Sequence, residues 1–160
     1  MKTIKTLNLK SQFPRLEVKS LTRDEIEIIR LWKNKNREFF FFSDEISKDM
    51  QLNWFKSYQT RIEDFMFVIW LDKQPLGVIG LRDLDGTWDI YNVIRGNDNL
   101  KGSGYMHKAL RIIIDFALEK NDKPITLKVL KNNPAVAWYL RNGFEVKEEL
   151  ENSFYLILSL

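Results

Sequence analysis

Hydrophobic and polar residues alternate with two different periods over the first part of the chain. Residues 16–21 (LEVKSL) alternate at every second position, which indicates a half-buried strand. In residues 22–34 (TRDEIEIIRLWKN) apolar side chains stand three and four apart behind a threonine, which predicts a capped helix. Residues 47–60 (SKDMQLNWFKSYQT) repeat that spacing, so we expect a second helix with Ser47 as its N-cap.

From residue 65 onward the pattern changes to short β-rich runs. Residues 65–71, 75–81 and 87–94 are rich in β-branched and aromatic residues, and the turn-forming segments DKQ and DLDG separate them. Runs that lie so close together in the sequence favour an antiparallel meander of three strands.

The last third of the chain combines both periods. An apolar stripe predicts a helix over residues 104–120, and residues 125–130 (ITLKVL) have the apolar character of a buried strand. Pro134 opens and Gly143 ends a second, short helix. Two more strands are expected at residues 144–150 and 154–159. Together the elements favour a mixed α/β (α+β) fold with helices on both faces of one sheet.

Composition narrows the possibilities mainly by exclusion. The chain has 160 residues, 44% hydrophobic and 29% charged, which indicates one globular domain over residues 1–160. The absence of cysteine excludes disulfides, thiolate nucleophiles and cysteine zinc sites, and makes the cytoplasm the expected location. Because there is also only one histidine, a transition-metal site lacks ligands. No stretch reaches the roughly twenty apolar residues of a membrane span, so we expect no membrane association.

The charge of the chain favours an anionic partner. The formal net charge is +3 and the sequence pI is about 9.0, a small excess that an anionic cofactor would satisfy. Lysines and arginines are spread along the chain, and no stacking motif for bases is present. We therefore do not expect nucleic acid as a partner.

Residues 99–110 (NLKGSGYMHKAL) place two glycines directly before a predicted helix. A strand that passes through glycines into a helix aims free backbone N–H groups at one point, which suits a phosphate. Gly102 and Gly104 would let an anion approach those amides, and Lys101 adds a positive charge. An ordinary turn is the alternative. The Gly-x-Gly-x-x-Gly pattern is excluded because His107 occupies the third glycine position, and no Gly-Lys-Ser/Thr loop is present.

A second motif gives the glycine loop a family context. The segment VIRGNDNLKGSGYMHKAL resembles the acetyl-CoA pyrophosphate loop of the GNAT superfamily of N-acetyltransferases, with Asn99, Gly102 and Gly104 at the motif positions. The segment NNPAVAWYLRNGFEV is similar to that family's following helix and strand, with matching positions at Asn132, Ala135, Tyr139, Gly143 and Phe144. Asn99 stands where the family usually has Arg or Gln, which leaves more of the pyrophosphate binding to backbone amides.

The resemblance implies a fold and a cofactor. It implies a mostly antiparallel twisted sheet of about seven strands with about four helices, and acetyl-CoA in a splay between the fourth and fifth strands, here those with Val93 and Leu127. Residues 65–160 would form the acetyl-CoA-binding core, and residues 1–64 would meet the acceptor. The residues implied to bind acetyl-CoA are Val93, Ile94, Arg95, Asn99, Leu100, Lys101, Gly102, Ser103, Gly104, Tyr105, Met106, Asn132, Ala135 and Tyr139.

The resemblance also implies roles in catalysis. The acceptor amine attacks the thioester directly, so no protein nucleophile is needed, and a backbone N–H near Val93 polarises the thioester carbonyl. Tyr139 would be the acid for the departing thiolate, and Asp89 the base, acting directly or through water. Tyr139 has a structural alternative, packing against Trp138. Competing bases are Glu38, Asp44 and Glu45, whereas His107 is expected at the surface or the cofactor's edge.

Asp89 could also be an ordinary solvated strand residue. Strict alternation places Asp89, Tyr91 and Val93 on one face of the strand and Trp88, Ile90, Asn92 and Ile94 on the other.

The acceptor side is marked by four consecutive phenylalanines in NREFFFFSDEIS. They cannot all face one core, so we expect Phe40 and Phe41 to line an acceptor pocket, with Arg37 suited to a diphosphate. The surrounding layout resembles GNAT enzymes that acetylate nucleotide-linked amino sugars and, more loosely, ribosomal-protein N-termini. We expect a small amine acceptor, such as a nucleotide-linked amino sugar; a protein N-terminus is the alternative. A non-catalytic acyl-CoA-binding or RNA-binding module is the third possibility. A monomer or a homodimer is expected.

Overall fold

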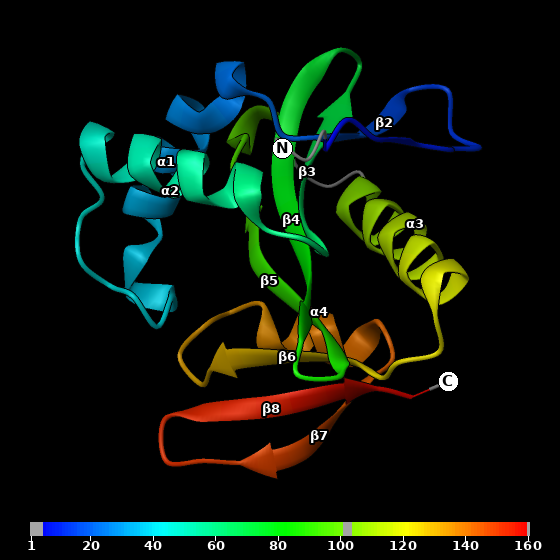
Figure 1. The fold of residues 1–160 in the computed structure, drawn as a ribbon. Helices are drawn as coiled ribbons and strands as arrows, with labels where there is room; N and C mark the ends of the chain where they lie inside the picture. The colour runs from blue at the N-terminus through cyan, green and yellow to red at the C-terminus, as the bar shows by residue number, and fades with distance from the viewer. Residues whose placement is uncertain (1–4, 101–103, 160) are drawn as a thin grey trace.

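One mixed β-sheet forms the centre of the protein in a computed structural model that describes residues 5–100 and 104–159 (Figure 1). The described residues form eight strands in the order β1-β2-β3-β4-β5-β6-β8-β7. Neighbouring strands are antiparallel except β5 and β6, which run parallel. The strands are β1 (Asn8–Leu9), β2 (Leu16–Ser20), β3 (Asp64–Leu71), β4 (Gln74–Leu84), β5 (Thr87–Arg95), β6 (Ile125–Leu130), β7 (Phe144–Glu149) and β8 (Ser153–Leu158).

The predicted mixed fold is confirmed, with one strand more than the expected seven. The additional strand, β1, has two residues and pairs with β2. It is too short to display a period of two, so no sequence pattern announces it. The other predicted strands are confirmed to within a few residues.

Four α-helices accompany the sheet in the described part of the chain. They are α1 (Ile26–Lys35), α2 (Lys48–Thr60), α3 (Tyr105–Lys120) and α4 (Val136–Arg141), with short 3-10 turns η1 (Arg23–Glu25), η2 (Arg37–Phe39) and η3 (Asp98–Leu100). The predicted cap of α2 is confirmed, because the Ser47 hydroxyl accepts a hydrogen bond from the Met50 amide at 3.1 Å. Thr22 caps η1, the turn that leads into α1.

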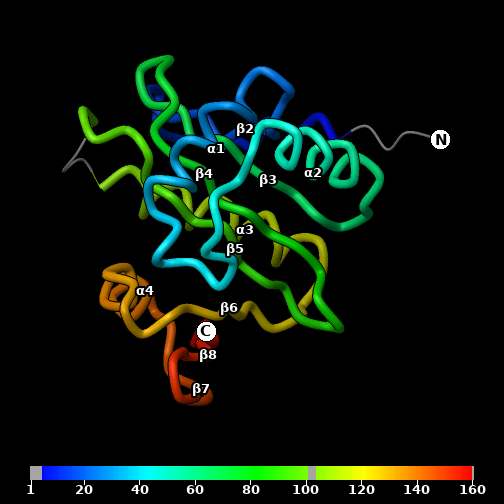
Figure 2. Tube along the Cα trace, turned by 90° about the vertical axis from the view of Figure 1, so that its left-hand side faces the viewer, coloured from blue at the N-terminus to red at the C-terminus, as the bar shows by residue number. Residues whose placement is uncertain are grey.

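Helices cover both faces of the sheet, as the sequence predicts. On one face, Trp32 of α1 and Tyr58 of α2 pack with Val68 in a buried cluster. On the other face, the apolar stripe of α3, including Ile113, packs against Trp88. Figure 2 views the molecule from the side of α1 and α2, with α3 beyond the sheet. Helices α1 and α2 lie on the same face of the sheet. The chain that joins them passes over β5 and β6 on this face (Figure 2).

A β-bulge interrupts β5. The register of β5 against β4 shifts after Tyr91, so that Asn92 and Val93 oppose a single residue of β4. Asn92 has φ 49°, in the left-handed region that asparagine tolerates better than most residues. A bulge leaves the extra residue outside the regular ladder and bends the strand.

The bulge corrects the predicted faces of this strand. Val93 packs with the core on the α3 side together with Trp88, whereas Ile94 packs with Tyr91 on the α1 side. Asn92 also lies on the α1 side, where it accepts a hydrogen bond from Lys33. Strict alternation is therefore wrong for Asn92, Val93 and Ile94, because it assumes an unbroken pleat.

Candidate active site

β5 and β6 separate after a short parallel ladder (Figure 1). Their pairing extends only from Trp88 and Ile125 to Ile90 and Leu127, so the remainder of each strand has no partner across the gap between them. Unpaired backbone groups beside such a gap can bind an extended ligand as an added strand. A cavity of about 320 Å³ lies at this open end, and we call it the splay cavity. It is lined by Asn36, Phe39, Phe40, Val93, Ile94, Arg95, Met106, Asn133, Pro134, Ala135 and Trp138.

The first turn of α3 adds hydrogen-bond donors beside the splay cavity. Gly104 precedes the helix with φ 69°, and a Cβ there would meet nothing, so glycine is needed for its backbone conformation and not for space. Gly104, the N-cap residue of this 16-residue helix, has no side chain that could cap its first amides. Such amides, at the positive end of the helix dipole, favour an anion.

Ten of the fourteen predicted cofactor residues fall into three groups. Five of them line the splay cavity: Val93, Ile94, Arg95, Met106 and Ala135. Asn99 and Leu100 lie in η3, just before α3. The predictions for Lys101, Gly102 and Ser103 fall outside the described residues.

Two other predicted cofactor residues point elsewhere. The ring of Tyr105 lies beneath the Lys108 ammonium, 4.5 Å from the ring centre, and does not line the splay cavity. The Asn132 side chain donates to the Glu38 carbonyl at 3.1 Å, which ties the loop before α4 to η2. Its neighbour Asn133, which the sequence analysis missed, lines the splay cavity instead.

A larger groove lies on the α1 side of the same strands. We call this hollow of about 710 Å³ the aromatic groove; it shares Val93, Phe39, Phe40 and Asn133 with the splay cavity. Both residues predicted to be catalytic, Asp89 and Tyr139, line it. Its other lining residues include Lys33, Phe41, Phe42, Trp54, Arg61, Arg82, Tyr91, Asn92 and Lys128.

Tyr139 is a buried side chain of α4 with 5% of its surface exposed. Its ring contacts those of Trp138 and Phe144, with centroids 5.3 and 6.0 Å away. The predicted packing against Trp138 is thus present together with the position in the groove. Burial raises the pKa of the Tyr139 phenol, so it holds its proton at neutral pH and can donate it.

Asp89 is buried in β5 and only 4% exposed, which excludes an ordinary solvated position. One carboxylate oxygen accepts a hydrogen bond from Arg82 Nε at 2.8 Å. Burial raises the pKa of Asp89 and outweighs the opposing effect of Arg82. A carboxylate with a raised pKa is a stronger proton acceptor.

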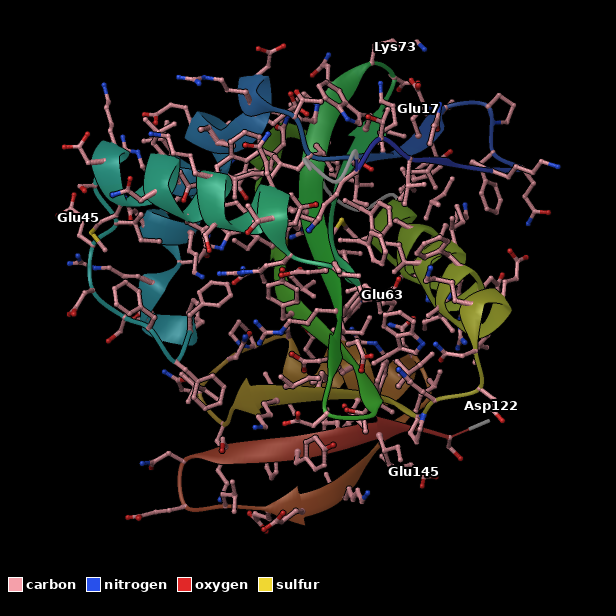
Figure 3. The ribbon with its side chains drawn as sticks, in the orientation of Figure 1. Glu17, Glu45, Glu63, Lys73, Asp122 and Glu145 are labelled. Carbon is pink, nitrogen blue, oxygen red and sulfur yellow. The ribbon has the colours of Figure 1, made fainter. Side chains whose placement is uncertain are left out.

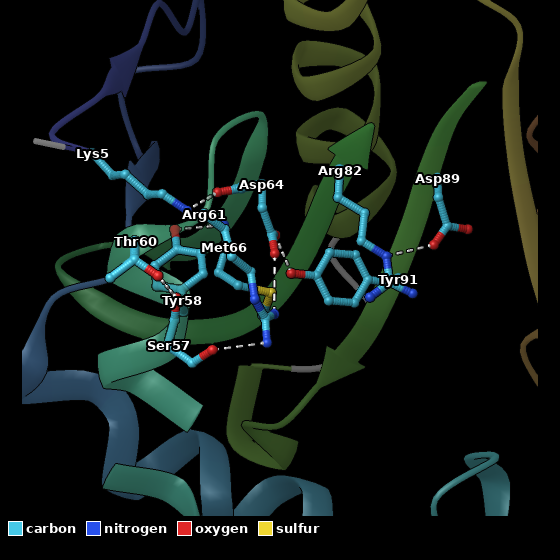
Figure 4. Close-up of polar contacts among 10 residues, drawn as sticks. All are labelled: Lys5, Ser57, Tyr58, Thr60, Arg61, Asp64, Met66, Arg82, Asp89 and Tyr91. Atoms are coloured by element: carbon cyan, nitrogen blue, oxygen red, sulfur yellow. Dashed lines mark hydrogen bonds and ion pairs between the residues drawn. The ribbon is translucent and has the colours of Figure 1, made fainter. Parts of the chain in front are cut away.

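A buried polar network joins Asp89 to a second carboxylate that the sequence analysis missed (Figure 4). The Arg82 guanidinium lies 4.1 Å from the centre of the Tyr91 ring, and the Tyr91 hydroxyl donates to Asp64. Asp64, which is 4% exposed, also pairs with Arg61 at 3.3 Å. Burial, together with the negative charge of Asp64, raises the pKa of Tyr91. The alternation of β5 already placed Tyr91 beside Asp89, but no local pattern links either residue to Asp64.

The predicted acceptor residues have unequal positions. Phe40 is half-buried and lines both cavities, and Phe41 is 60% exposed at the rim of the aromatic groove. Arg37 is exposed outside the groove lining, 4.0 Å from Glu45.

The competing bases predicted for this region lie at the surface. Glu38, Asp44 and Glu45 are exposed and do not line the aromatic groove; Figure 3 shows Glu45 on the segment before α2. His107 contacts Asn142 near the end of α4, away from the groove. Of the four carboxylates that the sequence analysis proposed as a base, Asp89 alone lines the aromatic groove.

Within residues 5–100 and 104–159, no three His, Cys, Asp or Glu side chains lie together as potential metal ligands. None of the helices formed by these residues combines the length and apolar character needed to span a membrane.

Comparison with known proteins gives this geometry a context. The family model described as an acetyltransferase (GNAT) domain matches residues 15–145. No curated protein is similar enough in sequence to be recognised as a relative.

Solved structures share the fold over nearly the whole chain. The N-acetyltransferase PseH of Campylobacter jejuni is 25% identical, with a TM-score of 0.67 and coverage of 91% of this chain and 99% of its own. FdhC, described as a nucleotide-linked sugar GNAT, is 20% identical, with a TM-score of 0.77 and coverage of 95% and 89%. RimL, a ribosomal L7/L12 α-N-protein acetyltransferase, is 14% identical, with a TM-score of 0.73 and coverage of 95% and 93%.

Proposed function

The chain belongs to the GNAT family and is an acetyl-CoA-dependent N-acetyltransferase; from this premise we propose that it acetylates a small primary amine, with a nucleotide-linked amino sugar as the first candidate. One observation carries the proposal. Asp89 of β5 and Tyr139 of α4 line one groove, and that groove meets the splay cavity at Val93. A proton acceptor and a proton donor therefore line the groove that adjoins the splay cavity.

The residues around the splay cavity fit acetyl-CoA. The unpaired parts of β5 and β6 offer backbone groups for the amides of a pantetheine arm, and the first amides of α3 suit a pyrophosphate. Val93, Met106 and Ala135 supply an apolar lining. Acetyl-CoA supplies a thioester whose carbonyl carbon the amine attacks and whose thiolate departs.

Two side chains of the groove each carry out one of the two proton transfers. Asp89 accepts a proton from the acceptor ammonium, directly or through water, which frees the amine lone pair. Backbone N–H groups at the bulge beside Val93 stabilise negative charge on the carbonyl oxygen. Tyr139, which is protonated at neutral pH, donates its proton to the departing sulfur.

The charges of the aromatic groove favour an anionic acceptor. Four cations line it, Lys33, Arg61, Arg82 and Lys128, against the single carboxylate Asp89. Phe40 and Trp54 offer faces suited to a sugar ring or a base. FdhC, with a similar fold, is described as acting on a nucleotide-linked sugar. A polycationic amine would be repelled by this lining.

A protein N-terminus is the second candidate, and the RimL likeness favours it. It would be held best by carboxylates around its ammonium group. Glu38, Asp44 and Glu45 are exposed and outside the groove lining, which makes this acceptor second to the amino sugar.

Two measurements test the proposal. Acetyl-CoA should raise the thermal unfolding midpoint, whereas ATP at the same concentration, a polyanion control, should raise it little, because a ligand that binds only the folded state stabilises it. Thiol release from acetyl-CoA should then be measured with a UDP-linked amino sugar, a short peptide with a free N-terminus, and spermidine. Faster release with the peptide than with the sugar nucleotide would reverse the order of the two candidates.

A further inference from the structure

Lys33 lines the aromatic groove, and its charge has no carboxylate partner among the described residues. It lies on α1, and its ammonium donates to Asn92 Oδ1 at 2.7 Å and lies 5.2 Å from the centre of the Phe40 ring. It also lines a second cavity of about 240 Å³ beside the groove, which we call the side pocket. The side pocket is formed mainly by apolar residues of α1, α2 and β5, including Ile29, Met50 and Ile94.

The charge of Lys33 is not neutralised by the described part of the protein. No Asp or Glu side chain of residues 5–100 and 104–159 lies within ion-pair distance of its ammonium, and the nearby Arg82 repels it. Burial, and secondarily the charge of Arg82, lowers the pKa of Lys33. Because a half-buried cation without a counter-ion loses part of its hydration, an anion that binds beside it recovers part of that cost.

The other cations of the groove are differently placed. Arg61 pairs with Asp64 at 3.3 Å and Arg82 pairs with Asp89 at 2.8 Å, so both already have a carboxylate partner. Lys128 is exposed to solvent. An ammonium has three donors, and Asn92 uses one of those of Lys33. Two N–H groups therefore remain for a ligand.

We propose that Lys33 is the anchor for a phosphate group of the acceptor, in place of Arg37, which the sequence suggested for a diphosphate. This inference rests on the proposed function, since it assigns a part of the acceptor to the aromatic groove. Lys33 binds Asn92, the bulge residue next to Val93, so a phosphate held there lies beside the strand segment that adjoins the splay cavity. The anchor thereby holds the acceptor in the groove that Asp89 lines, beside the segment of β5 that adjoins the splay cavity.

Binding of phosphate probes to the protein saturated with coenzyme A tests the anchor without requiring turnover. Coenzyme A occupies its own pyrophosphate site, so UDP, ADP and inorganic pyrophosphate report the groove, and uridine is the uncharged counterpart of UDP. In calorimetric titrations, UDP should bind at least about tenfold more tightly than uridine, the size of one charge-assisted contact. Lys33→Met should remove that preference, and Lys33→Arg should keep most of it. The matched control is Lys56→Met on α2, an exposed lysine outside the groove lining, which should change nothing.

The same titrations separate the anchor from a purely structural role of Lys33. If Lys33 only held the bulge through Asn92, Lys33→Met would weaken coenzyme A as much as the phosphate probes. The anchor predicts that the phosphate probes lose at least about tenfold while the dissociation constant of coenzyme A changes less than about threefold. Equal losses, no loss, or no preference for UDP in the unchanged protein would each overturn it. Failure of the proposed function is a separate outcome, namely no thiol release with any amine.

Discussion

The cofactor side and the acceptor side of this active centre are built in different ways. The splay cavity is defined largely by backbone: two strands that stop pairing, the start of helix α3 and a glycine with φ 69°. The aromatic groove is defined by side chains from α1, η2, β4, β5, β6 and α4, held by ion pairs and ring contacts. A binding site formed by backbone groups depends on residues that are adjacent in the sequence, so it can be recognised as a sequence motif. A binding site formed by side chains combines residues that are far apart in the sequence, so no motif marks it.

The largest expected effect is at Tyr139, the proposed acid that lines the aromatic groove. Tyr139→Phe should lower kcat by about 10²–10⁴-fold, because the departing thiolate loses its proton donor, while coenzyme A affinity stays nearly unchanged. Steady-state kinetics and a coenzyme A titration measure the two quantities. Tyr155→Phe on β8, outside the lining of both cavities, is the matched control. An unchanged kcat in Tyr139→Phe would remove this residue from the chemistry.

Asp89 should set the pH dependence of the acceptor side. The value of kcat/KM should rise with pH as the Asp89 carboxyl loses its proton and becomes a base. Because burial raises the pKa of Asp89, the midpoint of this rise should lie above the ordinary aspartate pKa of about 3.9. Asp89→Asn should abolish that rise and lower kcat/KM by about 10²-fold or more at neutral pH. Asp122→Asn, an exposed residue (Figure 3), should keep the full profile. The same rise in Asp89→Asn would assign it to another group.

The contact between the two sides is sensitive to a single methyl group. A Cβ on Gly96, directly after β5, would overlap the indole of Trp32 on α1. Gly96→Ala should therefore lower the free energy of unfolding by about 1–3 kcal/mol, measured by urea denaturation. In a Trp32→Leu background the added cost should shrink, since the clash is with that ring. An equal cost in both backgrounds would place its cause elsewhere.

The smallest expected effect separates two neighbouring phenylalanines. Phe40 is half-buried and lines both cavities, whereas Phe41 is at the exposed rim. Phe40→Ala should raise the KM for the acceptor by about tenfold, equivalent to about 1.4 kcal/mol, and Phe41→Ala by less. Thermal unfolding of both variants checks that folding is retained. A larger KM effect for Phe41 would mean that the acceptor binds at the rim of the groove.

Much of the fold could be predicted from the sequence because its signals are local. The period of apolar residues located α1, α2 and α3, and Ser47 marked the start of α2. Pro134 and Gly143, the latter with φ 95°, marked the two ends of α4. The two-residue β1 and the bulge after Tyr91 could not be predicted in this way, because both depend on the neighbouring strand and on no local preference.

The same distinction applies to the site. The resemblance of residues 93–106 and 132–139 to GNAT motifs implied acetyl-CoA and Tyr139, and such motifs can be recognised because their residues lie close together in the sequence. Only the tertiary structure decided that Asp89 is buried beside Arg82 and that Tyr91 of β5 contacts Asp64 of β3 across the intervening strand β4. It also decided that Lys33 lines the aromatic groove while Arg37 does not. Burial and charge balance are properties of residues far apart in the sequence. The burial and the charge balance of a residue are determined only when the sheet and helices bring its neighbours together.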